Sequence, residues 1–378
     1  MTHCRLCRCE LGGAPALCYA GMPALSQHLP ETPEPGGVEL RVTECPACGL
    51  VQLDNAPVPY YREVIRAAAY SPEMGEFRKK QFSDWVAKYG LSGGRILEPG
   101  CGRGEYLKLL REAAPVEVCG TEYGAAAAES ARAEGLEVER IFFEHGDERV
   151  AKAPCDGFFT FNYLEHLPDP AAFLRGIRGN LAEGAYGIVE VPDFGMMLGK
   201  SMFSEFTIDH LAYYTTETLR KMLEINGFEV CDCRSVWHGY IISAEVRKRR
   251  PTDFSGFDAA SARLFGEIAA FCGSSAPEEL AVWGAGHQAF ALLAASNLAK
   301  RFSCIIDSAD FKQGRYAPAS ALPIVAPAEL DAGKIGKVLI MAGSYSDEIA
   351  ASIRRKYGRR HTLALVREDH LETVDLTI

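Results

Sequence analysis

The segment RILEPGCGRGEYLKLL, residues 95–110, constrains the fold of this 378-residue chain more than any other. An apolar run ends there, the three glycines Gly100, Gly102 and Gly104 follow at every second position, and an amphipathic stretch begins directly after them. A strand, a glycine turn and a helix N-terminus in this order form the cofactor-binding turn of a Rossmann-like α/β domain. The segment therefore predicts such a domain with a cofactor at its first turn.

Two acidic residues near this turn indicate which cofactor it binds. Glu98 precedes the glycines, and Glu122 ends the next predicted strand, VEVCGTE. An acid before the turn would repel a pyrophosphate but attract the ammonium and sulfonium groups of S-adenosylmethionine, and the second acid can bond both ribose hydroxyls. The pattern favours S-adenosylmethionine. The alternatives are NAD and a glycine loop that only turns the chain.

The organisation of the chain follows from its alternating patterns. Short apolar runs alternate with helical patterns from about residue 63 to 250, which predicts a parallel sheet with crossover helices. The basic stretch EVRKRRP (245–251) is expected to be a solvated linker rather than a binding arm. After it the patterns restart and predict a smaller α/β unit. We therefore expect three domains, at residues 1–62, 63–250 and 251–378.

The N-terminal domain contains paired cysteines. Cys4 and Cys7 form one C-x-x-C pair, and Cys45 and Cys48 form another. Two such pairs give four thiolates, which suit a closed, tetrahedral, structural zinc site. Redox chemistry is the alternative, but no βαβ pattern surrounds either pair. Two cysteines rank lower as substitute ligands: Cys9 and Cys18.

Composition excludes several classes of protein. The formal net charge of −10 argues against a general nucleic-acid binder, which needs a basic face. The sequence contains no run of 18 apolar residues, so it predicts no transmembrane helix. The start MTHCRLCRCEL lacks the apolar region of a secretory signal. We expect a cytoplasmic protein whose partner is a small molecule, neither a nucleic acid nor a membrane.

Further segments resemble one family. CDGFFTFNYLEHLPDP and DHLAYYTTETLRKMLEINGFEV resemble class I methyltransferases. Together with CPACGLVQL and CIIDSADFKQGRYAPASALPIVAPAEL, they make nearly the whole chain resemble the sugar C-methyltransferases. That family has an N-terminal zinc domain, an S-adenosylmethionine domain and a C-terminal Rossmann-like domain, and acts on nucleotide-linked 4-keto-sugars in deoxysugar and antibiotic biosynthesis. The resemblance implies the same domains and a nucleotide-sugar substrate, and it is compatible with a monomer.

The resemblance also implies a reaction centre. The family's Tyr-His-Glu-His segment corresponds to TIDH, which retains His210 and an acid, Asp209, but has Thr207 in place of the tyrosine. Methylation of a carbon beside a keto group needs a base, and histidine suits this role near neutral pH. His210 is therefore the expected base and Asp209 is expected to tune or position it. His166 and Tyr70 are expected as supporting groups.

The remaining expectations concern cofactor contacts and alternative functions. Phe143 and Asn162 complete the set of expected cofactor contacts. Thr207 leaves an O- or N-methyltransferase open. The turn VWGAGHQA, followed by Asp307, also fits an NAD fingerprint, so an NAD-dependent oxidoreductase is a second alternative. A non-enzymatic zinc-ribbon interaction protein is the third. His287 and Lys312 are candidates to face a nucleotide-sugar's phosphates, with a solvated Lys312 as the alternative.

Overall fold

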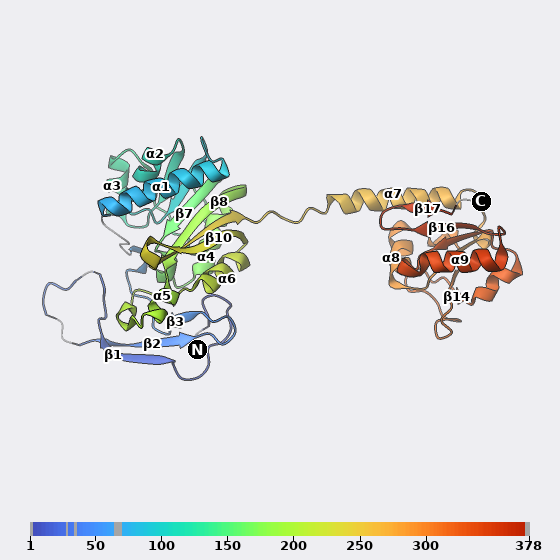
Figure 1. Ribbon diagram of the computed structural model, residues 1–378, viewed down its shortest axis with the longest axis horizontal. Helices are drawn as coiled ribbons and strands as arrows, with labels where there is room; N and C mark the ends of the chain where they lie inside the picture. Colours follow the sequence, from blue (N-terminus) through green and yellow to red (C-terminus); the bar gives the residue numbers. More distant parts are fainter. Residues whose placement is uncertain (1–2, 28, 34–35, 64–69, 375–378) are drawn as a thin grey trace. The chain divides into compact units, whose positions relative to one another are not determined.

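The computed structural model describes residues 3–27, 29–33, 36–63 and 70–374. The chain divides into two compact units, Met1–Pro251 and Thr252–Ile378, which are described separately (Figure 1). No helix among the described residues combines the length and hydropathy that a membrane-crossing segment needs.

The first unit is built on a seven-stranded sheet in the order β10-β11-β8-β7-β4-β5-β6. Strands β4 to β8 run parallel, whereas β11 is antiparallel to both of its neighbours, β10 and β8. The sheet therefore contains the predicted parallel strands and, in addition, the antiparallel strand β11. Its strands are β4 (Arg95–Pro99), β5 (Glu117–Thr121), β6 (Glu137–Glu139), β7 (Cys155–Phe161), β8 (Leu181–Pro192), β10 (Phe228–Val236) and β11 (Ile241–Lys248).

Helices cover both faces of this sheet (Figure 1). The central strand β7, CDGFFTF, is buried at all but one position, because a parallel strand covered on both sides has no polar face. One face of the sheet packs against α1 to α3, and the other packs against α4 and α6. The helices are α1 (Pro72–Tyr89), α2 (Glu105–Ala113), α3 (Ala125–Ala133), α4 (Pro170–Gly179), α5 (Phe194–Gly199) and α6 (Thr216–Ile225).

The basic stretch EVRKRRP was predicted to be a solvated linker, and the structure corrects this prediction. Its first four residues, 245–248, belong to β11, and only residues 249–251 are exposed. Val246 is completely buried, and Lys248 is 9% exposed. The lysine stem can enter the sheet because its ammonium donates to Leu181 O at 2.8 Å and pairs with Glu183 at 2.7 Å. The charged residues at the end of β11 therefore made this strand of the sheet resemble a linker in the sequence.

A second, four-stranded sheet joins the N-terminal region to the rest of the first unit. Its order is β1-β2-β3-β9, so the strand that follows His210 pairs antiparallel with β3. The two regions also share a hydrophobic core that includes Val58, Phe194 and Ile208. The predicted boundary after residue 62 stays a prediction, since no gap in packing marks it. The strands are β1 (Leu17–Met22), β2 (Val38–Glu44), β3 (Val51–Leu53) and β9 (Ala212–Tyr213).

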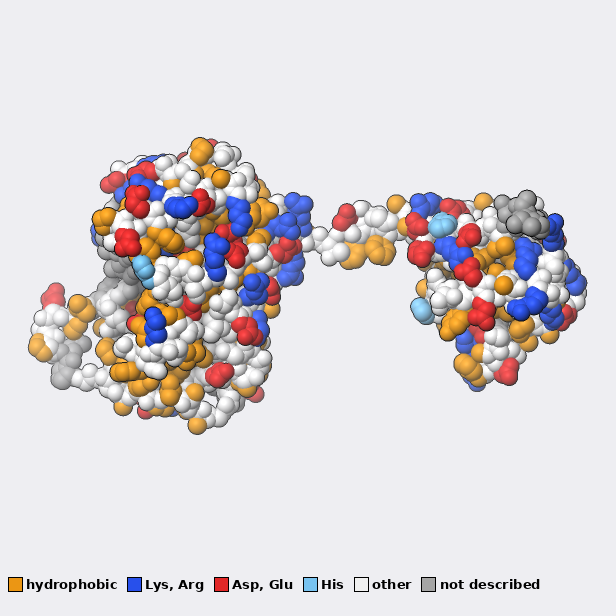
Figure 2. Space-filling view, in the orientation of Figure 1, with side chains coloured by type: hydrophobic (Ala, Val, Ile, Leu, Met, Phe, Trp, Pro, Cys, Tyr) orange, Lys and Arg blue, Asp and Glu red, His pale blue; other side chains and the backbone are white. Residues whose placement is uncertain are grey.

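A groove of about 600 Å³ lies between these strands and α5. Leu198 and Phe203, 60% and 67% exposed, contribute apolar side chains to it. Figure 2 shows hydrophobic side chains gathered on the part of the first unit that carries β1, β2 and α5. The N-terminal strands and α5 thus form one wall of the unit, directly beside the segment that leads to His210.

The second unit has a six-stranded sheet in the order β14-β13-β12-β15-β16-β17. All pairs are parallel except β16 with β17. This is the smaller Rossmann-like unit that the sequence predicts. Its elements are α7 (Ser255–Cys272), β12 (Leu280–Trp283), α8 (His287–Ser296), β13 (Cys304–Ile306), β14 (Ile324–Val325), β15 (Lys337–Ile340), α9 (Ser346–Tyr357), β16 (Thr362–Val366) and β17 (Leu371–Thr373).

Candidate functional site

The glycine turn after β4 adopts a backbone that only glycine enters easily. Gly100, Gly102 and Gly104 have φ angles of +65°, +58° and +78°. A Cβ at Gly104 would lie 2.1 Å from Leu136 Cδ1, and one at Gly100 would lie 3.2 Å from the Tyr163 ring. Gly104 is also the N-cap of α2, so the turn directs the amide groups of that helix toward the carboxyl ends of the strands. The turn is a cradle that side chains would fill.

We expect Gly104→Ala to lose S-adenosylmethionine affinity and to lower the unfolding temperature. The methyl group would clash with Leu136 in addition to straining the backbone, and a strained φ alone costs about 1–2 kcal/mol. The control is Gly135→Ala, because Gly135 has a φ of +73° and no atom within 4 Å of the added Cβ. Calorimetry and thermal unfolding check this. Equal losses in the two variants would show that the turn is not a tight cradle.

The two predicted acidic residues lie at the ends of adjacent strands. Glu98 is fully buried near the end of β4. Glu122 follows β5, and its carboxylate accepts from Gly102 N at 2.9 Å and from Gly124 N at 2.7 Å. These two bonds leave about two of the four acceptor positions of a carboxylate for a ribose diol. Glu122 therefore braces the glycine turn and keeps the capacity for the predicted ribose contact.

The two other predicted cofactor contacts differ in their placement. Asn162, with φ of +47°, follows β7, and its Oδ1 is buried without a hydrogen-bond partner among the described residues. Such an atom suits a ligand that donates a hydrogen bond. Phe143 is 1% exposed and packs in the core against Phe173. Phe142 instead faces Tyr123, the residue after Glu122, so the structure favours Phe142 over Phe143 at this edge.

Two histidines meet at the same edge of the sheet. His166 lies in the turn after β7, and its ring centroid is 4.7 Å from that of His210, at an interplanar angle of 79°. His166 Nδ1 is 2.9 Å from the carbonyl oxygen of Asp209. Because a carbonyl only accepts, Nδ1 carries the proton and Nε2 is left facing Glu165 Oε1 at 3.9 Å. The backbone of the segment that precedes β9 thus fixes the His166 tautomer.

Burial sets the protonation state of His210. The residue is partly exposed, yet burial of its ring lowers the pKa to about 4. His210 is therefore neutral at pH 7 and able to accept a proton. Glu165, His166 and His210 also offer ligand-type atoms within 4.8 Å of one another. A neutral His210 beside a second histidine and Glu165 is an arrangement suited to proton transfer.

The structure shows no hydrogen bond between the carboxylate of Asp209 and His210 among the described residues, so the expected tuning or positioning of His210 by Asp209 stays a prediction. Its Oδ1 accepts from the hydroxyl of Tyr60 at 2.7 Å. Its Oδ2 is buried without a hydrogen-bond partner among the residues described. Asp209 acts on the histidine pair through its backbone carbonyl instead, which accepts from His166. The physical reason is the tight turn before β9, where Asp209 and His210 project from successive positions.

Tyr70 lies at the start of α1. It is 38% exposed, and its ring stacks on Tyr106 of α2 with centroids 6.1 Å apart. The contacts described for Tyr70 are with this helix pair and not with His166 or His210. The supporting catalytic role stays a prediction that these contacts do not favour.

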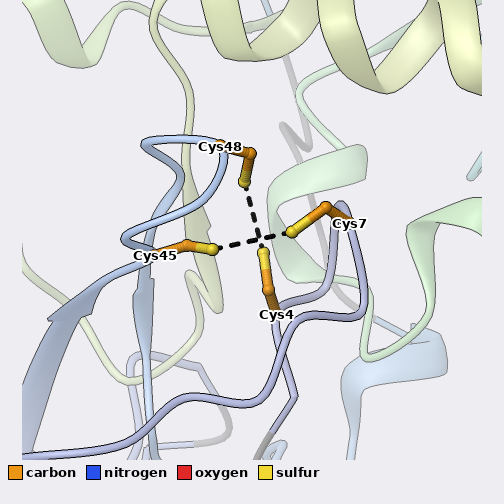
Figure 3. A group of neighbouring side chains, drawn as sticks. All are labelled: Cys4, Cys7, Cys45 and Cys48. Carbon is orange, nitrogen blue, oxygen red and sulfur yellow. Dashed lines mark hydrogen bonds between the residues drawn. The ribbon is translucent and has the colours of Figure 1, made fainter.

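The four predicted metal ligands converge on one point (Figure 3). Cys4 and Cys48 place their sulfur atoms 3.5 Å apart, and Cys7 and Cys45 place theirs 3.6 Å apart. Zinc–sulfur bonds of about 2.3 Å in a tetrahedron separate sulfurs by about 3.8 Å, so this donor set fits zinc. Burial raises the pKa of Cys4 to about 11. Backbone amides of Cys48 and Ala47 outweigh burial at Cys45 and lower its pKa to about 7.

The second unit has its own pocket of about 690 Å³ at the carboxyl ends of β12, β13 and β15. Gly284, with φ of +113°, and Gly286 line it at the start of α8. Asp307 accepts from Ala285 N at 2.8 Å and from Lys312 Nζ at 3.0 Å. Despite burial, these bonds and one from the Ala309 amide hold the pKa of Asp307 below its usual value.

Lys312 is held by its ion pair with Asp307 and is not free in solvent, which corrects the alternative of a solvated Lys312. Its Nζ also donates to Ala285 O at 2.9 Å. Asp307 accepts three hydrogen bonds, which fill most of the roughly four acceptor positions of a carboxylate. Asp307 is therefore poorly placed to serve a ribose in the manner of an NAD site. His287, the first residue of α8, lines the pocket, and its contact with phosphates stays a prediction.

Sequence reasoning missed Tyr60 and Ser26. Tyr60 lies 149 positions from Asp209 in the chain, so no local spacing connects them. The backbone amide of Ser26 donates to the Tyr60 hydroxyl at 3.1 Å, and the Ser26 hydroxyl lies 2.5 Å from the Thr207 hydroxyl. The only signal in the sequence was that Thr207 departs from a tyrosine, which indicated that the site is lined differently.

Comparisons with known proteins agree with this geometry. Residues 74–232 match the family model "Methyltransferase domain", and residues 247–364 match "C-methyltransferase C-terminal domain". The C-methyltransferase NovU of Streptomyces niveus is 24% identical over 395 residues, 92% of this chain and 91% of that protein. A probable S-adenosylmethionine-dependent methyltransferase of Mycolicibacterium smegmatis is 28% identical over 166 residues, 43% of this chain and 63% of that protein.

Solved structures also match part of the chain. Magnesium protoporphyrin IX methyltransferase (ChlM) from Synechocystis PCC 6803 with bound SAH is 16% identical and covers 49% of this chain and 90% of its own, with a TM-score of 0.37. The plantazolicin methyltransferase BpumL in complex with SAH is 12% identical and covers 47% and 86%, with a TM-score of 0.38.

The two family models and the curated relatives define the protein as an S-adenosylmethionine-dependent methyltransferase of the class I fold. The predicted fold and enzyme class are thereby confirmed, and the comparisons support S-adenosylmethionine as the cofactor. More particularly, the chain has the domain order of a methyltransferase domain followed by a C-methyltransferase C-terminal domain, and it is similar to the C-methyltransferase NovU over 92% of its length.

Proposed function

We propose that the protein methylates a carbon of a nucleotide-linked 4-keto-deoxysugar and that His210 is the base. The observation that carries this proposal is the placement of His210, whose ring lies 4.7 Å from that of His166 at the strand ends that also carry the glycine turn. The similarity to NovU, which is named a C-methyltransferase, supports carbon as the acceptor atom. The resemblance to sugar C-methyltransferases supplies the substrate class.

The cofactor occupies the glycine turn in this proposal. Gly100, Gly102 and Gly104 leave room for it, and Glu98 and Glu122 supply the negative charge that a sulfonium cation favours. The buried Oδ1 of Asn162 accepts one hydrogen bond, and Phe142 takes the apolar contact predicted for Phe143. Bound S-adenosylmethionine supplies an electrophilic methyl group.

The histidines of the chain do the proton chemistry. His210 removes the proton from the carbon next to the keto group, and the electron pair of that C–H bond moves into the enolate. A base with a pKa of about 4 is weak, so the enolate oxygen must be stabilised for the step to proceed. His166, whose Nδ1 proton is held by Asp209 O, faces the site through Nε2, which donates only after it takes up a proton.

The zinc site and the second unit have supporting roles in this proposal. Cys4, Cys7, Cys45 and Cys48 hold a structural zinc with all four positions filled by thiolates, so the metal takes no part in the reaction. The pocket at Gly284 and Lys312 suits a nucleotide, because a helix N-terminus and a lysine attract phosphate.

The test is a reaction of the purified enzyme with a nucleoside diphosphate-linked 4-keto-deoxysugar in deuterated water. We expect mass spectrometry to show deuterium next to the carbonyl without cofactor, and a new carbon-bound methyl group when S-adenosylmethionine is added. Methylation at oxygen or nitrogen without deuterium exchange would replace this proposal with the alternative acceptor atom. Calorimetry with a nucleoside diphosphate and with NAD tests the second pocket, and tight binding of NAD alone would contradict its assigned role.

A further inference from the structure

A chain of hydrogen bonds links the N-terminal region to the reaction centre. The Tyr60 hydroxyl donates to Asp209 Oδ1 at 2.7 Å and accepts from the amide of Ser26 at 3.1 Å. The Ser26 hydroxyl lies 2.5 Å from that of Thr207. Burial and the neighbouring Asp209 raise the pKa of Tyr60, so its phenol keeps the proton that it donates. Thr207 and Asp209, the two residues that flank Ile208, are therefore both hydrogen-bonded by side chains of the N-terminal region.

Asp209 has unused capacity that points to a ligand. Its side chain is 3% exposed, and Oδ2 is buried without a hydrogen-bond partner among the described residues. A buried carboxylate oxygen without a donor is costly, and a donor from a bound molecule removes that cost. Hydroxyl groups are the donors that a sugar offers in abundance. Oδ2 is therefore suited to accept a hydrogen bond from the acceptor.

The elements behind this chain of hydrogen bonds are packed in a hydrophobic core and paired in a sheet. Ile208, next to Asp209, is 7% exposed and packs in the core that contains Val58 and Phe194. The strand that follows His210 pairs with β3 through Gln52 and Ala212. Tyr60 and Asp209 thus lie on one packed layer. The hydrogen bond between them therefore holds the Asp209 carboxylate in one orientation.

We propose that Tyr60 is a positioning residue of the acceptor site: it holds Asp209 through Oδ1 so that Oδ2 accepts a hydrogen bond from a hydroxyl of the acceptor, while Ser26 holds Thr207. The N-terminal region thereby supplies the hydroxyl groups that contact Thr207 and Asp209. This inference rests on the proposed function only in that the acceptor is a hydroxyl-bearing sugar; it holds for a methyl group transferred to carbon, oxygen or nitrogen.

The test compares Tyr60→Phe with Tyr89→Phe in the full-length enzyme. Tyr89 donates to Glu245 at the same 2.7 Å, on α1, and serves as the matched control. With the nucleoside diphosphate-linked 4-keto-deoxysugar, we expect Tyr60→Phe to lower kcat/KM about 10- to 100-fold, chiefly through KM of the acceptor, because a hydrogen bond to a charged group is lost. The Kd for S-adenosylmethionine and all parameters of Tyr89→Phe should stay within about twofold.

A double-mutant cycle with Asp209→Asn separates positioning from general damage to the fold. If Tyr60 acts through Asp209, its loss costs little in an Asp209→Asn background. Full additivity of the two losses, or an unchanged acceptor KM in Tyr60→Phe, would overturn the inference. Absence of turnover in the wild-type enzyme would instead count against the proposed function.

Hydrogen exchange supplies a readout that needs no acceptor. Peptides that span residues 207–213 should exchange faster in Tyr60→Phe than in the wild-type enzyme, whereas Tyr89→Phe should leave them unchanged. Equal protection in Tyr60→Phe and wild type would show that Asp209 is held without Tyr60, and would refute the positioning role even if no acceptor were turned over.

Discussion

His210→Ala is expected to lose methyl transfer by about 10²- to 10⁴-fold, the usual contribution of a general base, while the affinity for S-adenosylmethionine stays the same. Two separate regions explain the contrast. The cofactor contacts lie on the glycine turn and on Glu122, whereas His210 lies on the segment before β9. Steady-state kinetics and calorimetry measure the two effects independently.

Imidazole rescue distinguishes a base from a structural residue. His210 is partly exposed, so added imidazole can enter the space left by the substitution and restore part of the rate. Near-normal turnover of His210→Ala would remove this residue from the mechanism. A loss without rescue, accompanied by a lower unfolding temperature, would assign it a structural role instead.

The pH dependence of the wild-type enzyme follows from the same burial. Because the pKa of His210 is about 4, its neutral form dominates above about pH 5, and the acid limb of kcat/KM should lie below the usual histidine value of about 6.5. The stability consequence has a definite sign. The unfolded chain binds the proton more readily, so stability is full above about pH 6.5 and falls as the pH drops toward 4.

Cys45→Ser is expected to remove the zinc and to disorder the N-terminal sheet. A structural zinc in a four-thiolate site contributes folding free energy directly, so its loss destabilises the strands it holds. Elemental analysis should change from about one zinc per chain to none. The glycine turn belongs to the other sheet and should keep its affinity for S-adenosylmethionine, while methyl transfer falls, because β9 and the core around Ile208 depend on β3.

Cys18→Ser is the control for this experiment. Cys18 is exposed on β1 and lies outside the four-sulfur cluster, so the variant should keep its zinc and its activity. Zinc loss in Cys18→Ser, or a wild-type protein without zinc, would contradict the assignment of the four ligands. Equal loss of cofactor binding and methyl transfer in Cys45→Ser would show that the two sheets do not respond separately.

The sequence predicted local features well because they are written in adjacent residues. The glycine turn, the acid at each strand end and the two C-x-x-C pairs each lie within a short stretch, and each appears where it was expected. The strand at 241–248 was not predicted, because its charged end resembles a linker and the burial of Lys248 depends on two partners more than 60 positions away.

The contacts of Asp209 could not be predicted for a related reason. Its side chain bonds a tyrosine from the N-terminal region, and its carbonyl bonds His166, so its role depends on three segments that only the fold brings together. Phe143 and Phe142 show the same limit on a smaller scale. Neighbouring aromatic residues are equivalent in a sequence, and only packing against Phe173 or Tyr123 distinguishes them.

The antiparallel pairing of β3 with β9 has a consequence for exchanging parts between related enzymes. The N-terminal region is not an interchangeable module, because one strand of its sheet is contributed by the segment that carries His210. A chimera that took residues 1–63 from a relative would need residues 207–213 from the same parent to restore the pairing. This fold therefore predicts that the two segments vary together among related enzymes, although 140 or more residues lie between them in the chain.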